Sequence, residues 1–163
     1  SFAGKSARLS ALAWGAEDLA ADIGASSNKD DNGVYTDVFR LARSLTILAA
    51  ANSGVDAVDT VFTDFRDLDG LEAECKAAVR DGFTGKMAIH PDQVAVINQA
   101  FTPPREDVER AVRILALFAA AGPDAGVLSL DGKMIDRPHL RQAERVARLA
   151  GLKPDAMPSV SSS

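Results

Sequence analysis

Apolar and polar positions alternate in two different ways along the first two thirds of the chain. Three stretches are short and rich in apolar residues, which is typical of strands buried in a sheet. They cover residues 7–14, 55–62 and 85–89. Two longer stretches have apolar residues at three- and four-residue spacing, which predicts amphipathic helices. They cover residues 34–53 and 68–81 and end at Gly54 and Gly82.

The predicted core face of each helix follows from this spacing. In the helix over residues 34–53 it consists of Val34, Val38, Leu41, Leu45, Leu48 and Ala49. In the helix over residues 68–81 it consists of Leu71, Cys75, Ala78 and Val79. Residues 15–31 are small and polar, and we expect a loop there, with one helical turn at most after Asp18.

The last third of the chain predicts further helices and one hairpin. Helices are expected over residues 91–100, 105–121 and 137–150. The core face of the middle one would be Val108, Ala111, Val112, Leu115 and Phe118. Asp131-Gly132 lies between two apolar runs within residues 127–135, which predicts a two-residue hairpin turn.

The order of strand, helix, strand, helix, strand indicates an α/β fold with parallel strands. In such folds the chemistry lies beyond the carboxyl ends of the strands. The residues to consider are therefore 15–18, 64–67 and 90–93.

Composition narrows the class of protein. The chain has 163 residues, a net charge of −5 and one cysteine, which suits one ordinary globular domain in a reducing compartment such as the cytoplasm. The acidic balance argues against nucleic acid as a partner. The longest apolar run, residues 114–121, is too short to cross a bilayer, so no membrane partner is expected. Nucleotide-binding glycine motifs, zinc-protease motifs and serine-hydrolase motifs do not occur.

Two carboxylates follow the first predicted strand directly, in the segment Gly15-Ala16-Glu17-Asp18. Carboxylates at this edge of a sheet can hold Mg²⁺, which prefers oxygen ligands. They can equally be acidic residues that favour the amino end of a helix dipole.

Three further residues have a possible chemical role and a structural alternative. His90 precedes Pro91 at a strand end, where it could line a site or hydrogen-bond a neighbouring loop. Asp136 is well placed to cap the last helix, which explains it without catalysis. Cys75 lies on an apolar helix face and is interpreted as a core residue rather than a nucleophile.

Three segments together resemble the HpcH/HpaI aldolase family, which includes the citrate lyase beta subunit and the malyl-CoA and citramalyl-CoA lyases. They are LAWGAEDLAADIG at residues 12–24, GFTGKMAIHPDQ at residues 82–93 and LDGKMIDRP at residues 130–138. The resemblance extends over most of residues 7–152.

The resemblance implies a (β/α)₈ TIM barrel that assembles as a trimer or hexamer. Asp18 matches the family's metal-binding Asp, and Gly15, Ala16 and Glu17 match the turn against the substrate. His90 and Pro91 match a segment near the thioester end of coenzyme A. Asp136 matches a catalytic Asp that enters the neighbouring subunit's site.

A complete barrel needs at least about 200 residues, so this chain would be the C-terminal part of one. Residues 1–122 would belong to the barrel, residues 123–152 to a hairpin and helix extension, and residues 153–163 to a disordered tail. The family's metal-binding Glu and an Arg would lie on strands that precede Ser1. The chain lacks an initiator Met, so we expect it to need an N-terminal part. A separate complementing chain and a naturally short module are the alternatives.

The implied activity is Mg²⁺-dependent cleavage of a 3-hydroxyacyl-CoA, such as a citryl-, malyl- or citramalyl-CoA, to acetyl-CoA and a keto acid. Three alternatives stay open: a non-catalytic module that binds coenzyme A or protein, a thioester hydrolase of the same family, and a pyruvate aldolase that does not use coenzyme A.

Overall fold

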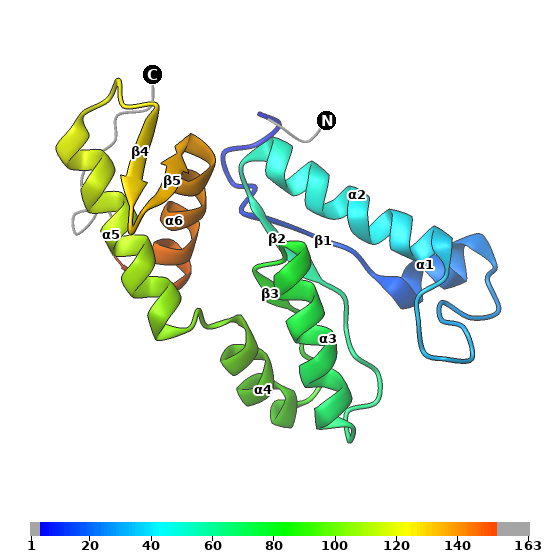
Figure 1. The fold of residues 1–163 in the computed structure, drawn as a ribbon. Helices are drawn as coiled ribbons and strands as arrows, with labels where there is room; N and C mark the ends of the chain where they lie inside the picture. Colours follow the sequence, from blue (N-terminus) through cyan, green and yellow to red (C-terminus); the bar gives the residue numbers. More distant parts are fainter. Residues whose placement is uncertain (1–3, 153–163) are drawn as a thin grey trace. The chain divides into compact units, whose positions relative to one another are not determined.

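The computed structural model describes residues 4–152, and the chain forms two compact units that divide between Phe101 and Thr102 (Figure 1). Each unit has its own hydrophobic core. The predicted disordered tail, residues 153–163, lies outside the described residues.

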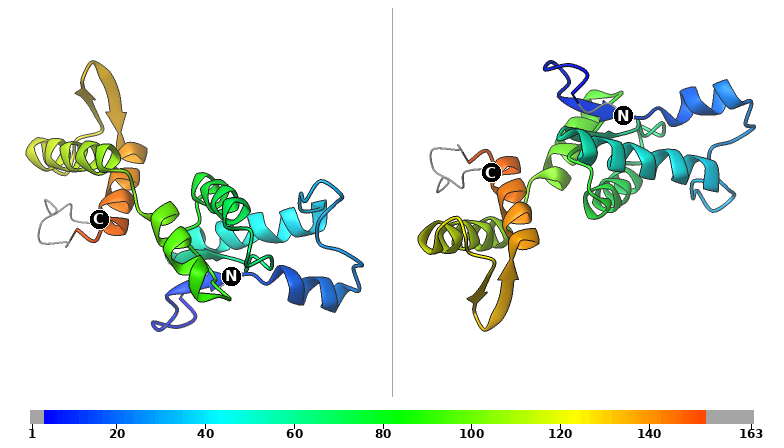
Figure 2. Two further views of the ribbon diagram at one scale, coloured as in Figure 1. Left: turned by 90° about the horizontal axis from the view of Figure 1, so that it is seen from below. Right: turned by 90° about the horizontal axis from the view of Figure 1, so that it is seen from above.

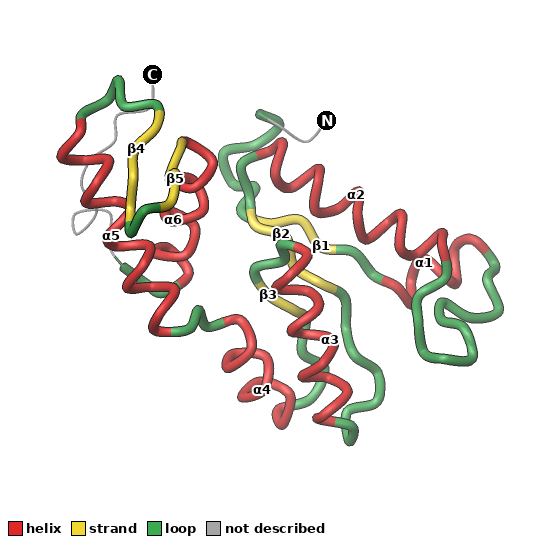
Figure 3. Tube along the Cα trace, in the orientation of Figure 1, coloured by secondary structure: helices red, strands yellow, loops and turns green. Residues whose placement is uncertain are grey.

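The first unit contains a three-stranded parallel sheet with the order β1-β2-β3, as the alternating pattern predicts. The strands are β1 (Ala11–Ala13), β2 (Asp56–Asp59) and β3 (Gly85–Lys86). Leu12 is in register with Ala57, and Val58 with Gly85. Each strand is short (Figure 3) and covers only part of the apolar run that predicted it. Single hydrogen bonds extend the pairing past the strand ends, such as the one from the Met87 N–H to the Asp59 carbonyl at 3.0 Å. The sheet confirms the α/β class and parallel pairing.

Helices connect and follow these strands. They are α1 (Ala16–Ile23), α2 (Asp37–Ser53), α3 (Leu68–Asp81) and α4 (Pro91–Phe101). In Figures 1 and 2, α2 runs beside β1 and β2, with which it is in contact, and α3 packs against α4. The predicted span of α3 is confirmed to the residue, and Cys75 is fully buried in its apolar face as predicted.

The expectation of a loop over residues 15–31 is wrong for α1, which makes two turns of helix. The Leu19-Ala20-Ala21 run favours helix, and Gly24 ends it in the left-handed region with φ +70°. There its N–H reaches the carbonyls of Ala20 and Ala21, a termination that a residue with a Cβ rarely adopts.

The expected core face of α2 is also wrong. The large residues of that stripe are 52–65% exposed: Val34, Val38, Leu41, Leu45 and Leu48. A different face, with Phe39 and Ala50 each 1% exposed, packs toward the sheet. Apolar residues cover most of the helix surface, and the small alanines of the buried face allow the helix to approach the strands closely. Val79 of α3, at 42%, is likewise exposed.

The second unit contains α5 (Arg105–Ala121), the antiparallel hairpin of β4 (Val127–Leu130) and β5 (Lys133–Asp136), and α6 (Arg137–Leu149). The hairpin turn is confirmed: Asp131 and Gly132 have φ values of 52° and 74°, the positive values that a type I′ turn requires. The core of the second unit includes Leu115, Phe118 and Ile135. Val112, which was expected on the same core face, is 45% exposed.

The boundary between the two units differs from the predicted boundary between barrel and extension. The structure groups α5 with the hairpin and α6, against which it packs. Assignment of residues 102–122 to the barrel and of residues 123–152 to an extension stays a prediction. No helix within residues 4–152 is both long and apolar enough to cross a membrane.

Candidate functional site

The turn that follows β1 is fixed to the end of β2 by two hydrogen bonds. The Trp14 indole Nε1–H donates to Asp59 Oδ1 at 2.7 Å, and the Ala16 backbone N–H donates to Thr60 Oγ1 at 3.0 Å. Trp14, Ala16, Asp59 and Thr60 are all buried. Gly15, the N-cap residue of α1, therefore lies between two residues that are hydrogen-bonded to the end of β2. These bonds fix the start of α1 at the carboxyl edge of the sheet.

Asp18 lies in the first turn of α1, is exposed, and makes no hydrogen bond or ion pair with residues 4–152. Its carboxylate folds back over Gly15, so that a Cβ on residue 15 would stand 2.3 Å from Asp18 Oδ2. The adjacent Glu17, by contrast, has a hydrogen-bond partner, since its Oε1 accepts from Asn28 Nδ2 at 2.7 Å. Asp18 is thus the available carboxylate of this turn.

The donor chemistry at Asp18 fits one protein ligand of a hard divalent cation. Mg²⁺ is commonly held by one or two carboxylates together with waters and substrate oxygens. Within residues 4–152 no group of three or more His, Cys, Asp or Glu side chains could hold a metal by itself. The dipole interpretation also applies, because Glu17 and Asp18 are both in the first turn of an eight-residue helix.

The loops after β2 and β3 meet through an aromatic contact. The rings of Phe65 and His90 stack with centroids 4.8 Å apart, and His90 Nδ1 lies 3.3 Å from the Asp92 backbone N. His90 thus contacts the neighbouring loop by stacking, whereas its hydrogen bond is to Asp92, two residues along the chain, and its side chain stays 37% exposed. Pro91 begins α4, where its missing N–H has no consequence.

Gln93 lies within the range 90–93 that follows the third predicted strand, but the sequence analysis gave it no role. It is fully buried, its Oε1 accepts the Ile89 N–H at 2.9 Å, and its Nε2 donates to the Phe62 carbonyl at 2.9 Å. It therefore ties the residues after β2 to those after β3. A buried glutamine has no sequence signal, since exposed and buried glutamines look alike in a helix pattern.

Asp136 caps α6 in the second unit, as predicted. Its side chain accepts from the His139 backbone N–H at 3.5 Å, and its Oδ1 lies 2.5 Å from His139 Nδ1. This hydrogen bond with His139 holds the pKa of the Asp136 carboxyl below its usual value, so the group is ionised at neutral pH. The cap does not test the predicted catalytic role of Asp136, which stays a prediction.

The largest feature that the sequence analysis missed is a charged cluster behind the turn. Lys86 Nζ lies 3.5 Å from Asp59 Oδ2 and 3.4 Å from Glu74 Oε2, and the Lys86 side chain is fully buried. Arg43 adds a contact of 3.4 Å from its Nε to Asp59 Oδ1 and one of 2.5 Å from its Nη1 to Asp81 Oδ2. The available signal was a charged residue inside each of two predicted buried strands, Asp59 within residues 55–62 and Lys86 within residues 85–89. Removing one partner of a buried ion pair typically destabilises a protein by about 3–5 kcal/mol.

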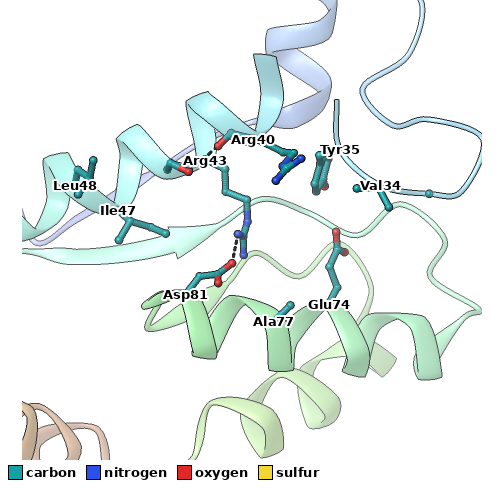
Figure 4. Close-up of a pocket in the computed structure, with 11 residues that line it drawn as sticks. Val34, Tyr35, Arg40, Arg43, Ile47, Leu48, Glu74, Ala77 and Asp81 are labelled. Atoms are coloured by element: carbon teal, nitrogen blue, oxygen red, sulfur yellow. Dashed lines mark hydrogen bonds and ion pairs between the residues drawn. The ribbon is translucent and has the colours of Figure 1, made fainter. Parts of the chain in front are cut away.

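A groove of about 570 Å³ lies between α2 and α3 (Figure 4), and Asp18 is not among the residues that line it. Its polar groups are largely occupied: Arg43 bonds Asp81, and Glu74 Oε1 accepts from Lys29 Nζ at 3.2 Å. Tyr35 borders it, and burial followed by the nearby Glu74 carboxylate raises the pKa of its hydroxyl well above the usual value.

This chain is similar in sequence to one known protein family and to several characterised enzymes. The model of the HpcH/HpaI aldolase/citrate lyase family matches residues 2–91. The mitochondrial citramalyl-CoA lyase of Mus musculus is 40% identical over 143 residues, covering 87% of this chain and 41% of the relative. A (3S)-malyl-CoA thioesterase of Cereibacter sphaeroides is 34% identical, covering 85% and 47%.

Among solved structures, the protein CitE of Mycobacterium tuberculosis in complex with magnesium, acetoacetate and coenzyme A matches with a TM-score of 0.68 and 40% identity. The match covers 85% of this chain and 51% of CitE. The chain thus spans about half the length of the relatives it matches.

Fold and turn together define an α/β chain with βα units and an exposed carboxylate, that of Asp18, at the carboxyl edge of a parallel sheet. This chain belongs to the HpcH/HpaI aldolase/citrate lyase family, as the resemblance of its three segments predicts.

Proposed function

We propose that this chain supplies part of the active site of a Mg²⁺-dependent carbon–carbon lyase that cleaves a 3-hydroxyacyl-CoA to acetyl-CoA and a keto acid. The observation that carries the proposal is the unpartnered carboxylate of Asp18 in a turn fixed at the carboxyl end of β1. Lyases and complexes with magnesium and coenzyme A among the relatives support it. The chain would be the C-terminal part of a TIM barrel, working as a homo-oligomer with the N-terminal part present.

In this proposal Asp18 supplies one oxygen ligand to the cation, and a Glu outside this chain supplies another. When bound, Mg²⁺ polarises the carbonyl of the keto-acid product as a Lewis acid. The turn at Gly15, Ala16 and Glu17 lies against the substrate. Two N–H groups there are available as donors, because helix geometry gives those of Glu17 and Asp18 no intrahelical acceptor and Gly15 has no side chain to cap them. They can stabilise negative charge on a substrate oxygen.

Asp136 is the proposed proton-transfer group, acting in a neighbouring subunit's site. Cleavage requires a base to take the proton of the 3-hydroxyl, after which the enolate of acetyl-CoA must gain a proton. Asp136 is ionised at neutral pH, which is the form that accepts the hydroxyl proton. His90 and Pro91 are proposed to lie near the thioester end of coenzyme A, where the stack of His90 on Phe65 would orient the loop.

The test is a product analysis with protein purified from its native host, so that any further chain or subunit is present. Malyl-CoA and citramalyl-CoA are each incubated with the protein and Mg²⁺. Acetyl-CoA together with a keto acid supports the lyase. Free coenzyme A without acetyl-CoA identifies the thioester hydrolase, for which the Cereibacter sphaeroides relative provides support. Binding of either thioester without turnover contradicts the enzyme and favours the binding module.

A further inference from the structure

The charged cluster behind the turn has three polar atoms that face one another. Lys86 Nζ, Asp59 Oδ2 and Glu74 Oε2 are buried, and none has a hydrogen-bond partner within residues 4–152. The two distances from Lys86 Nζ to these oxygens, 3.5 and 3.4 Å, are those of ion pairs. Lys86 therefore separates two carboxylates that would otherwise repel each other in a medium of low dielectric constant.

The two oxygens of Asp59 face in different directions. Oδ2 faces Lys86, whereas Oδ1 accepts the indole N–H of Trp14 at 2.7 Å and the N–H of Thr60 at 3.0 Å. Thr60 in turn accepts the N–H of Ala16. Both bonds that fix the residues on either side of Gly15 thus involve Asp59 and its neighbour. Arg43 Nε lies 3.4 Å from Oδ1 of Asp59, and Lys86 is the cation that faces Oδ2.

We propose that Asp59 and Lys86 are positioning residues for the turn that carries Asp18. The proposal rests on the proposed function, since Asp18 is the metal ligand only there. Groups that orient a metal ligand from behind typically change metal affinity by about 10–100-fold when they are removed. A cluster that only stabilises the fold would change the free energy of unfolding and leave the turn and the metal affinity as they are.

Trp14 is the only tryptophan of the sequence, so one indole N–H resonance reports on the bond to Asp59. The experiment uses the protein purified with any further chain or subunit present, and its Lys86→Met variant. It records the indole resonance, which is assigned by its loss in Trp14→Phe, together with Mn²⁺ affinity and urea unfolding. Lys76→Met is the control, because Lys76 is 66% exposed and its one ion pair among residues 4–152 is with Glu72. We expect Lys86→Met to shift the indole resonance and weaken Mn²⁺ binding about tenfold or more, and Lys76→Met to do neither.

A second variant separates positioning from stability. Lys86→Met with Glu74→Gln removes one charge of each sign, so the like charges left by the single change are relieved. We expect the double variant to recover the indole resonance and most of the Mn²⁺ affinity. An unchanged resonance and affinity in folded Lys86→Met overturn the proposal, and so does a double variant that recovers stability without either readout.

The proposed function fails by a different result. If Asp18→Asn binds Mn²⁺ as tightly as the unchanged chain, Asp18 is not the ligand. The indole resonance of Lys86→Met still decides whether the cluster sets the position of the turn.

Discussion

The carboxylate of Asp18 occupies the space that a side chain on residue 15 would need. A Cβ there would stand 2.3 Å from Asp18 Oδ2, although the backbone at Gly15, with φ −111° and ψ 108°, suits any residue. A side chain at this position would therefore displace the neighbouring carboxylate, although the backbone conformation itself would accept one.

Gly15→Ala should therefore displace Asp18 while leaving the fold intact. We expect Mn²⁺ affinity, measured by titration, to fall about tenfold, and the free energy of unfolding to change by less than about 1 kcal/mol. Gly126→Ala is the matched control, since an added Cβ meets nothing within 4 Å there. An equal loss of affinity in both variants would show that Asp18 does not depend on Gly15.

Capping and catalysis by Asp136 can be separated with one substitution. Asparagine caps a helix about as well as aspartate does but cannot accept a proton as a carboxylate can. We expect Asp136→Asn to unfold at nearly the same urea concentration as the unchanged protein at neutral pH, and to lose turnover of the thioester substrate. Turnover retained in Asp136→Asn would leave the cap as the role of this residue.

The lowered pKa of Asp136 predicts how the free energy of unfolding changes with pH. The hydrogen bond with His139 lowers the pKa of this carboxyl in the folded protein, so ionisation favours the folded state. Its contribution is present above the unfolded pKa of about 3.9 and is lost as the pH falls through the lower folded value. A carboxyl ¹³C titration by NMR should place Asp136 below the value in the urea-unfolded chain. A higher value in the folded chain would contradict the bond.

The correction to the core face of α2 gives opposite expectations for two large residues. Phe39 is 1% exposed and Leu48 is 65% exposed. Phe39→Ala should lower the free energy of unfolding by about 3–5 kcal/mol, whereas Leu48→Ala should change it by less than about 0.5 kcal/mol. Urea unfolding measures both. Similar losses in the two variants would contradict the buried face seen in the structure, because they would mean that Leu48 is also part of the core, as the spacing alone predicted.

The single cysteine should be unreactive in the folded chain. Burial raises the pKa of the Cys75 thiol to about 11, so little thiolate forms at mildly alkaline pH. We expect alkylation by iodoacetamide to be slow in buffer and fast in concentrated urea, followed by mass spectrometry. Fast alkylation of the folded chain would mean that the face of α3 around Cys75 opens readily.

Local patterns predicted the elements but not always the face that each one buries. The span of α3 and the hairpin at Asp131-Gly132 follow from spacing and turn chemistry, which are local properties. The buried side of α2 does not, because Phe39 and Leu48 both stand at helical spacing and the choice between them depends on the sheet.

In the candidate site, too, local patterns identified some residues and missed those that depend on distant partners. Asp18 was found because it follows a strand directly, whereas Asp59, Lys86 and Gln93 were missed. Their roles depend mainly on partners 12 to 45 positions away in the sequence, from the Lys86–Glu74 pair, 12 apart, to the Trp14–Asp59 pair, 45 apart. No periodicity in one strand or helix indicates such a pair.

The most direct test of the central claim compares Asp18→Asn with Asp22→Asn. Both residues are exposed on α1 and both changes remove one negative charge, so general electrostatic effects are matched. The measurement is the dependence of acetyl-CoA formation on Mg²⁺ concentration, with Mn²⁺ affinity measured in parallel. We predict that Asp18→Asn abolishes Mg²⁺-dependent turnover and weakens Mn²⁺ binding, and that Asp22→Asn behaves as the unchanged protein. Equal turnover and equal Mn²⁺ affinity in the two variants would contradict the assignment of Asp18 as the metal ligand.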